Sequence, residues 1–303
     1  MAALHNRLPI FLMVALLSGF CARVWADELR LITEKSFDVK KGERLKAESY
    51  SGDVKVTAWE KDECSVKIYG DDKAEKIMEF YIEKSGEGVV VKIKKEGKSS
   101  NWFGNNGRVR LEVKVPADFN LVVTTAGGDV TIAGVSGELK LTTAGGDIRT
   151  SGGEGELKAT TAGGDIIVKE FTGDVKMSTA GGDIRGEKIK GAVDASTAGG
   201  DIILQCANGK VNASTSGGDI RIDFSGTYFG IKASTTGGDV AVRVPGDIKA
   251  DIYASTFSGD IECQFDVENV RKYGNAKAEG SVNGGGEKLK CTTTGGDIKI
   301  AMK

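Results

Sequence analysis

The chain after about residue 120 is organised by a short element, T-x-G-G-D-[IV], which occurs in nine copies between residues 125 and 298, one of which has Ser258 in place of the first glycine. Six consecutive copies follow one another at a strict interval of 18 residues. The aspartates of the nine copies are Asp129, Asp147, Asp165, Asp183, Asp201, Asp219, Asp239, Asp260 and Asp297. Self-similarity at a fixed period indicates a repeat architecture in which each unit packs against the next.

The residues before each aspartate alternate between apolar and polar side chains. Leu139 and Leu141 precede Asp147 by eight and six residues, and the polar Lys140 lies between them. This period of two indicates a β-strand with one buried face. Short strands of this kind bury their apolar faces when equivalent strands stack about 4.8 Å apart. We therefore expect an all-β fold, a single-stranded parallel β-solenoid of 18-residue coils over residues 121–303.

The glycine pair of each element fits a tight corner of such a coil. We expect positive φ angles there, and a Cβ would clash with the neighbouring coil. The threonine before the pair is expected to form an internal ladder, with its hydroxyl bonded to backbone groups of the turn. The threonines of the six regular copies are Thr125, Thr143, Thr161, Thr179, Thr197 and Thr215.

Stacked aspartates would repel one another by roughly 1 kcal/mol per pair in water. Two arrangements would relieve this repulsion. In the first, each carboxylate accepts N–H groups of its own corner. In the second, cations bridge the column, as in a calcium-stabilised β-roll. The spacing between glycine and aspartate differs from the spacing in the β-roll nonapeptide. This difference favours turn capping without a cofactor over a Ca²⁺ site.

Residues 1–26 have the pattern of a secretory signal peptide. Arg7 precedes an apolar run from Leu8 to about Phe20, and cleavage is expected near Ala26. The run is short for a membrane-spanning helix, so we expect no transmembrane segment. The protein is therefore expected outside the cytoplasm, in the periplasm, on the cell surface or secreted.

Composition excludes several classes of function. Removing residues 1–26 takes away Arg7, Arg23 and no acidic residue, so the formal net charge changes from −2 to −4. This acidic balance argues against nucleic acid as a partner. The only histidine, His5, lies in the signal segment, so catalysis that depends on histidine is excluded after cleavage.

Four cysteines remain after cleavage, at positions 64, 206, 263 and 291. Their irregular spacing favours buried, reduced side chains, while one disulfide, such as Cys263–Cys291, stays open as an alternative.

Residues 27–120 lack the 18-residue rhythm but remain rich in strand patterns, so we expect a β-rich N-terminal cap over the open end of the solenoid. Residues 265–288 form an irregular insertion before the last copy. The order of Ser51-Gly52-Asp53-Val54, then Val113-Lys114-Val115-Pro116, then serial T-x-G-G-D-I copies resembles the bacterial putative-adhesin family of unknown function with β-strand repeats. The resemblance implies an extracytoplasmic, right-handed β-solenoid, and it carries no catalytic residues.

Two groups of residues are candidate partner contacts. Arg149, Arg185 and Arg221 would line one face at every second coil, either gripping an anionic glycan or neutralising nearby aspartates. Trp102 and Phe103 lie at the centre of a polar loop, where they would anchor a partner or fold back over the solenoid end.

The sequence thus predicts a protein that is not an enzyme and serves as an adhesin-like interaction module or scaffold of the cell envelope. Its partner would be an unidentified glycan or protein of the envelope or surface. Two alternatives are a calcium-stabilised β-roll and a β-helix that binds or processes polysaccharide. Short coils leave little loop from which to build a catalytic pocket.

Overall fold

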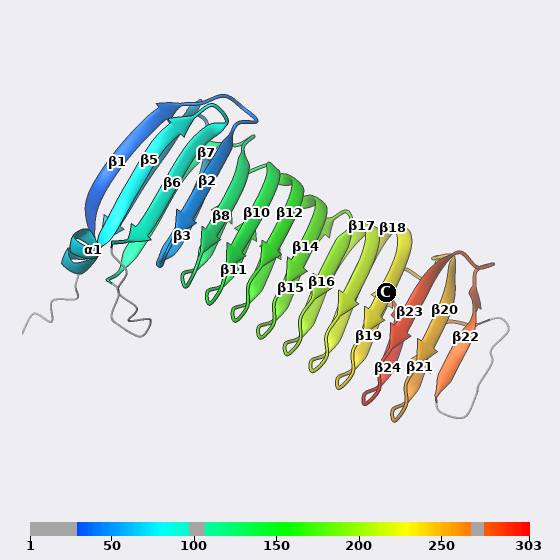
Figure 1. The fold of residues 1–303 in the computed structure, drawn as a ribbon. Coiled ribbons are helices and arrows are strands. Elements are labelled where there is room, and N and C mark those ends of the chain that lie inside the picture. Colours follow the sequence, from blue (N-terminus) through cyan, green and yellow to red (C-terminus); the bar gives the residue numbers. More distant parts are fainter. Residues whose placement is uncertain (1–28, 97–106, 268–275) are drawn as a thin grey trace, which may run out of the picture.

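The computed structural model describes residues 29–96, 107–267 and 276–303. These residues form 24 strands and one short helix, α1 (Asp72–Ile77). The strands lie side by side in a long rack, in two rows that we call sheet 1 and sheet 2 (Figure 1), and their apolar side chains share one core.

Sheet 1 begins at the N-terminal end of the rack. In spatial order its strands are β5 (Met78–Ser85), β6 (Gly88–Lys95), β2 (Arg44–Ser49), β8 (Asn120–Thr125), β10 (Gly137–Thr143), β12 (Glu154–Thr160), β14 (Thr172–Ser178), β16 (Val193–Ser196), the second halves of β17 (Ile202–Ser214) and β18 (Ile220–Ser234), β23 (Glu287–Thr292), β20 (Ala250–Ser255) and β22 (Lys277–Val282).

The strands of sheet 2 are given in spatial order from the same end of the rack. They are β1 (Arg30–Asp38), β4 (Glu63–Gly70), β7 (Val109–Pro116), β3 (Asp53–Trp59), β9 (Val130–Ala133), β11 (Ile148–Ser151), β13 (Ile166–Lys169), β15 (Ile184–Lys190), the first halves of β17 and β18, β19 (Val240–Val244), β24 (Ile298–Met302) and β21 (Ile261–Cys263). Because β17 and β18 run through both rows, hydrogen bonds connect all 24 strands.

Neighbouring strands of the regular part pair in parallel, with equivalent residues 18 positions apart. Leu139 pairs with Leu157 in sheet 1, and Ile148 pairs with Ile166 in sheet 2. A T-x-G-G-D turn leads from each sheet 1 strand to the following sheet 2 strand, and these turns lie along one edge of the rack (Figure 1). The prediction of an all-β fold with stacked parallel strands is confirmed.

The N-terminal region contains more than a cap. Strands β2 and β3 stack directly on the regular repeats, since Leu45 pairs with Leu121 and Val54 with Val130. Strands β6 and β7 add one further parallel layer. Antiparallel strands β5, β4 and β1 then end the two sheets. Residues 27–120, which we expect to form a β-rich cap, include the strands β2 and β3 that stack on the first regular repeat.

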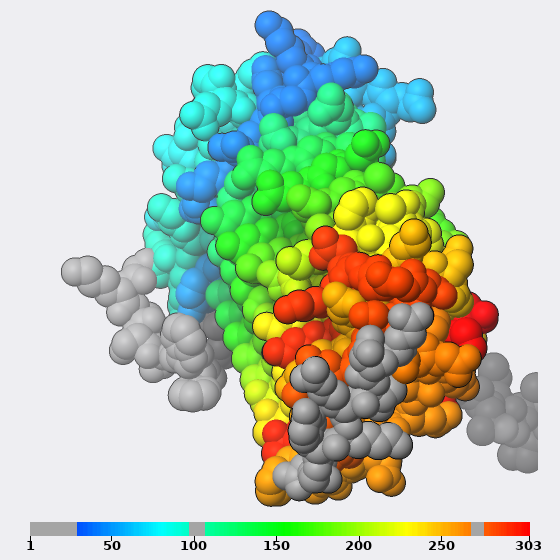
Figure 2. Space-filling model, turned by 90° about the vertical axis from the view of Figure 1, so that its right-hand side faces the viewer, coloured from blue at the N-terminus to red at the C-terminus, as the bar shows by residue number. Residues whose placement is uncertain are grey.

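At the C-terminal end the coils do not stack in the order of the sequence. The last coil, β23 and β24, lies between the coil of β18–β19 and the coil of β20–β21. Leu289 accordingly pairs with Ile231 on one side and with Ile252 on the other. Figure 2 shows the red and orange-red residues of this coil beside yellow and orange ones. Part of the insertion 265–288 forms β22, which pairs antiparallel with β20 and ends sheet 1.

The two glycines of each turn have different surroundings. A Cβ built on Gly164, the second glycine of its pair, would lie 2.1 Å from the carbonyl oxygen of Gly146 in the preceding coil. A Cβ on Gly163, the first, would lie 3.7 Å from its nearest neighbour. The expected clash is therefore present at the second glycine. The expected positive φ is wrong, because positive-φ glycines lie at the opposite corner instead, as at Gly155 (φ 126°) and Gly173 (φ 126°).

This difference predicts opposite outcomes for two neighbouring alanine substitutions. Gly164→Ala should lower the free energy of unfolding by about 2–3 kcal/mol, because the backbone of the coil above must move. Gly163→Ala, its matched control, should change stability by less than about 1 kcal/mol. Chemical denaturation followed by circular dichroism measures both, and equal losses would contradict the packing described.

All four cysteines of the described residues are unpaired, so the alternative of a Cys263–Cys291 disulfide is wrong. Cys64, Cys206 and Cys291 are buried, and Cys263 is partly buried. Burial raises the pKa of Cys64 and of Cys206 to about 12, and it raises the pKa of Cys291 as well. A buried thiol with a raised pKa holds little reactive thiolate at neutral pH.

Thiol labelling should therefore distinguish these cysteines. In the folded protein at pH 8, Cys263 should react with a disulfide reagent well before the other three, which should react only after unfolding. Peptide mass spectrometry locates the modified thiols. Fewer than four labelled positions among these residues after unfolding without reductant would reveal a disulfide and contradict the structure.

Candidate functional site

The threonines of the repeat element join successive turns. The Thr161 hydroxyl donates to the carbonyl oxygen of Gly146 in the preceding coil at 2.9 Å and accepts the N–H of Gly164 in its own turn at 3.3 Å. The same pair of bonds recurs at Thr125, Thr143, Thr179, Thr197 and Thr215. These hydroxyls are part of the scaffold and are turned away from any ligand, since the side chains are buried.

The aspartates form one column, but their bonds differ from the expectation of capping within the same corner. The carboxylate of Asp147 accepts the backbone N–H of Asp165, in the next coil, at 2.8 Å. Equivalent bonds run from Asp53 through Asp129, Asp147, Asp165, Asp183, Asp201, Asp219, Asp239 and Asp297 to Asp260. The interpretation that each carboxylate caps its own corner is therefore wrong, because the N–H group that it accepts belongs to the aspartate of the next coil. Each carboxylate instead binds one coil to the next.

The column predicts a contrast between two substitutions at Asp183, whose Oδ1 accepts the N–H of Asp201. Asp183→Ala removes this acceptor and should lower the free energy of unfolding by about 1 kcal/mol. Asp183→Asn keeps an oxygen acceptor and removes one negative charge from the column, so its stability should equal or exceed that of the unaltered protein. Urea denaturation compares the two, and an equal loss in both variants would contradict the role of the acceptor.

The three candidate arginines lie on the outer face of sheet 2 and behave differently. Arg149 bridges two aspartates of the column, with Nη1 3.1 Å from Asp129 and Nη2 2.6 Å from Asp147. Arg185 and Arg221 are exposed and form no ion pair with the described residues. The structure therefore does not bring the three together into one cluster. Trp102 and Phe103 lie outside the described residues.

Within residues 29–96, 107–267 and 276–303, no group of three or more histidine, cysteine, aspartate and glutamate side chains is arranged to hold a metal ion. The single described helix, α1, does not have the length and apolarity needed to cross a membrane.

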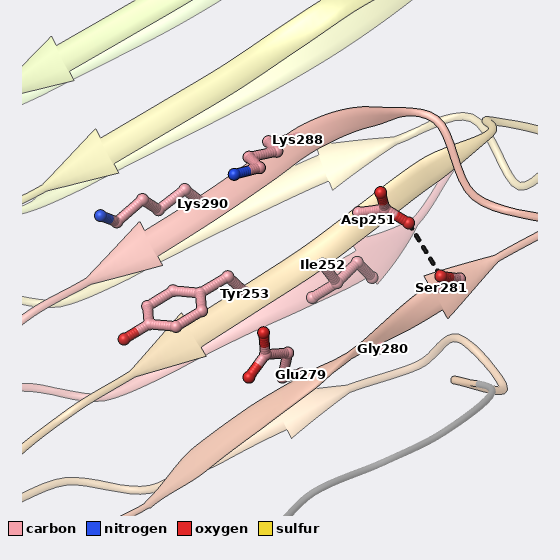
Figure 3. A pocket seen from close by; sticks show the side chains of 8 residues that line it. All are labelled: Asp251, Ile252, Tyr253, Glu279, Gly280, Ser281, Lys288 and Lys290. Carbon is pink, nitrogen blue, oxygen red and sulfur yellow. Dashed lines mark hydrogen bonds between the residues drawn. The ribbon is translucent and has the colours of Figure 1, made fainter.

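A groove on the outer face of sheet 1 was not foreseen from the sequence. It crosses β23, β20 and β22 near the C-terminal end and has a volume of about 540 Å³. Figure 3 shows the lining side chains Tyr253 and Asp251 of β20 between Lys288 and Lys290 on one side and Glu279 and Ser281 on the other.

Tyr253 is held between two lysines in this groove. The Nζ of Lys277 lies 4.9 Å from the centroid of its ring, and the Nζ of Lys290 lies 5.3 Å from it. An ammonium over an aromatic face is attracted by the ring quadrupole. Ser281 donates a hydrogen bond to Asp251 at 2.8 Å, and Lys277 pairs with Glu279 at 3.2 Å. The groove therefore has oriented side chains before any partner binds.

A second hollow of about 430 Å³ continues the groove across β18 and β17. The two hollows share Asp251, Lys288 and Lys290. Phe229, at its rim, has 53% of its surface exposed. We call the combined surface the lysine groove, and its defining residues are Lys210, Phe229, Lys232, Asp251, Tyr253, Lys288 and Lys290.

The lysine groove could be predicted in full only if the stacking order of the coils were known. Lys288 and Lys290 are distant in sequence from Lys232, and the register brings Lys290 beside Lys232 and Tyr253. The available signal was the alternation of Lys288, Leu289 and Lys290, which predicts two lysines on one outer face.

A rack of stacked, mostly parallel strands with one common core and an open surface groove defines a β-solenoid-like protein. The chain belongs to the family described as Toastrack DUF4097, whose sequence pattern matches residues 42–301. This membership agrees with the resemblance to putative adhesins seen in the sequence.

Two solved structures described as putative adhesins are similar to this chain. A putative adhesin from Parabacteroides merdae matches with a TM-score of 0.52 and 13% identity, over 89% of this chain and 95% of that chain. A putative adhesin from Bacteroides fragilis matches at 17% identity with a TM-score of 0.43, over 91% of this chain and 99% of that chain. At such identities the likeness shows the fold alone. Comparison with curated proteins found no match.

Proposed function

We propose that this protein is an exported, non-catalytic interaction module of the cell envelope, adhesin-like in its action, which binds its partner through the lysine groove. The observation that carries the proposal is the groove itself, an open hollow with pre-oriented aromatic and charged side chains on a rigid sheet. Binding sites generally combine concave shape with a few convergent polar groups.

Three further points support the proposal. The N-terminal 26 residues have the pattern of an export signal. Proteins of the same fold from Parabacteroides merdae and Bacteroides fragilis are described as putative adhesins. Short turns, in place of long loops, connect most of the regular strands, which suits an open binding surface better than an enclosed reaction site.

The finer architecture belongs to the same proposal. We take the solenoid to be right-handed with 18-residue coils, in keeping with the strong preference for right-handed crossovers between parallel strands. A regular, stiff rack of this kind would hold the groove at a fixed distance from the N-terminal end, as a scaffold for surface contact requires.

Binding to isolated cell-envelope material tests the function. The protein should be retained by envelope fractions of a bacterium that encodes it, and Phe229→Ser should weaken that retention about tenfold, because an exposed aromatic ring at a groove is a typical binding anchor. Tyr81→Ser is the matched control, since Tyr81 is 59% exposed on β5 at the far end of the rack.

Retention that is absent, or that Tyr81→Ser reduces as strongly as Phe229→Ser does, would refute the proposed function. Circular dichroism and thermal unfolding of both variants separate lost binding from lost folding.

A further inference from the structure

We propose that the ligand of the lysine groove is an acidic polysaccharide, whose carboxylates bind the lysines while its hydroxyls bind Asp251 and Glu279. This inference rests on the proposed function and specifies the chemical class of the partner. It follows from how charge is distributed along two neighbouring columns of sheet 1.

In three neighbouring coils these columns carry no net charge. Each of these coils places one acidic residue two positions before a lysine, in the pairs Glu138–Lys140, Glu156–Lys158 and Asp174–Lys176. These side chains share the outer face of the sheet, and each lysine therefore has a carboxylate close by along its strand. Lys176 also pairs with Asp194 of the next coil at 3.2 Å.

The charge on these columns becomes mostly positive in the groove. The acidic column continues through Ala192 and Lys210 to Lys288 and then Asp251. The lysine column continues through Asp194, Asn212, Lys232 and Lys290 to Tyr253. All four lysines are exposed, and none forms an ion pair with a described residue. These four lysines outnumber the three carboxylates that line the groove, Asp251, Glu279 and Glu287. The groove is therefore locally positive on a protein whose net charge is negative. Such a concentration of charge at a hollow attracts an anionic partner.

The repeat of the sheet favours a polymer over a single small anion. Lys232 and Lys290 lie on adjacent paired strands, which are about 4.8 Å apart, and Tyr253 occupies the same position on the next strand. Two positive groups therefore lie side by side along the rack axis, and Lys210 and Lys288 stand on the neighbouring column. A chain molecule with regularly spaced carboxylates can occupy several of them at once, and its binding free energy gains from each.

The other side chains of the groove favour a sugar over an acidic protein or nucleic acid. Asp251 and Glu279 lie beside the lysines and are acceptors for hydroxyl groups, which a polysaccharide carries on every residue. Phe229 offers an exposed aromatic face on which the apolar C–H face of a sugar ring can stack.

Titration with three defined polymers tests the inference. Polygalacturonate carries a carboxylate on each sugar, dextran is a neutral polysaccharide, and poly-glutamate is an acidic polypeptide. We expect the full chain to bind polygalacturonate, to bind dextran and poly-glutamate at least tenfold more weakly, and to lose affinity as salt is raised.

Two double variants with the same change in net charge locate the binding. Lys288→Gln with Lys290→Gln should weaken binding of polygalacturonate about tenfold, through the loss of two charge contacts. Lys140→Gln with Lys158→Gln, on the same outer face but outside the groove, should leave it within about twofold. All four lysines are exposed, and thermal unfolding verifies that both variants fold.

The outcomes separate the two proposals. Equal binding of dextran, equal binding of poly-glutamate, or equal losses in the two double variants would overturn the acidic polysaccharide while retention by envelope fractions still stood. Binding of none of the polymers would also overturn it. If envelope retention were absent too, the proposed function would fall with it.

Discussion

The contact between the second glycine of each turn and the carbonyl of the turn before it controls the spacing of the whole molecule. A Cβ at this position would lie 2.0–2.3 Å from a backbone oxygen at most of the turns, so only glycine lets the coils approach to the distance at which strands pair. The threonine hydroxyl and the aspartate carboxylate bond across the same junction. Both sheets begin or end at this turn, and their register is therefore set by it. Threonine, glycine and aspartate are invariant in the regular copies of the turn, and these three residue types make the contacts between one turn and the next.

Both ends of the rack depart from simple stacking, and both departures concern the unpaired strand edges of a parallel sheet. A parallel sheet leaves unpaired strand edges at its two ends, and such edges tend to pair with other chains. At the N-terminal end, β1 and β5 run antiparallel to their neighbours, and the Lys35 ammonium of β1 donates to the carbonyl oxygen of Ile82 on β5, which links the last strands of the two sheets. At the C-terminal end, the final coil enters between two earlier ones and β22 covers the edge of β20. The coil of β20–β21 acquires its inner neighbour only when the last residues of the chain are in place.

The regular part of the fold was predictable from the sequence, because each repeat makes the same contacts with the next one. The alternation around Leu139 and Leu141 predicted the strands and their buried faces, and the fixed 18-residue interval predicted their register. The stacking order of the coils was not predictable where the 18-residue interval breaks. The copy ending at Asp297 carries the same contact residues as any other copy, so it fits beside either Asp239 or Asp260. The aspartate column was foreseen as a column, but the direction of its bonds depends on how one turn lies over the next, which no single repeat encodes. The glycine pair was foreseen at a corner, whereas its φ angles follow from the path of the turn.

The lysine groove is a consequence of that unforeseen order. If the last coil lay outside the coil of β20, Tyr253 would adjoin Lys232 directly, and Lys290 would occupy the outer position that the β22 residues now hold. The inserted coil instead sets Lys290 between Lys232 and Tyr253. It also frees the outer side of β20 for β22, which supplies Lys277 as a second ammonium near the Tyr253 ring. A charged surface that no contiguous segment contains is thus assembled by the same step that closes the end of the solenoid. Because the groove and the closed end need the same coil in the same place, loss of the final strands would remove both together.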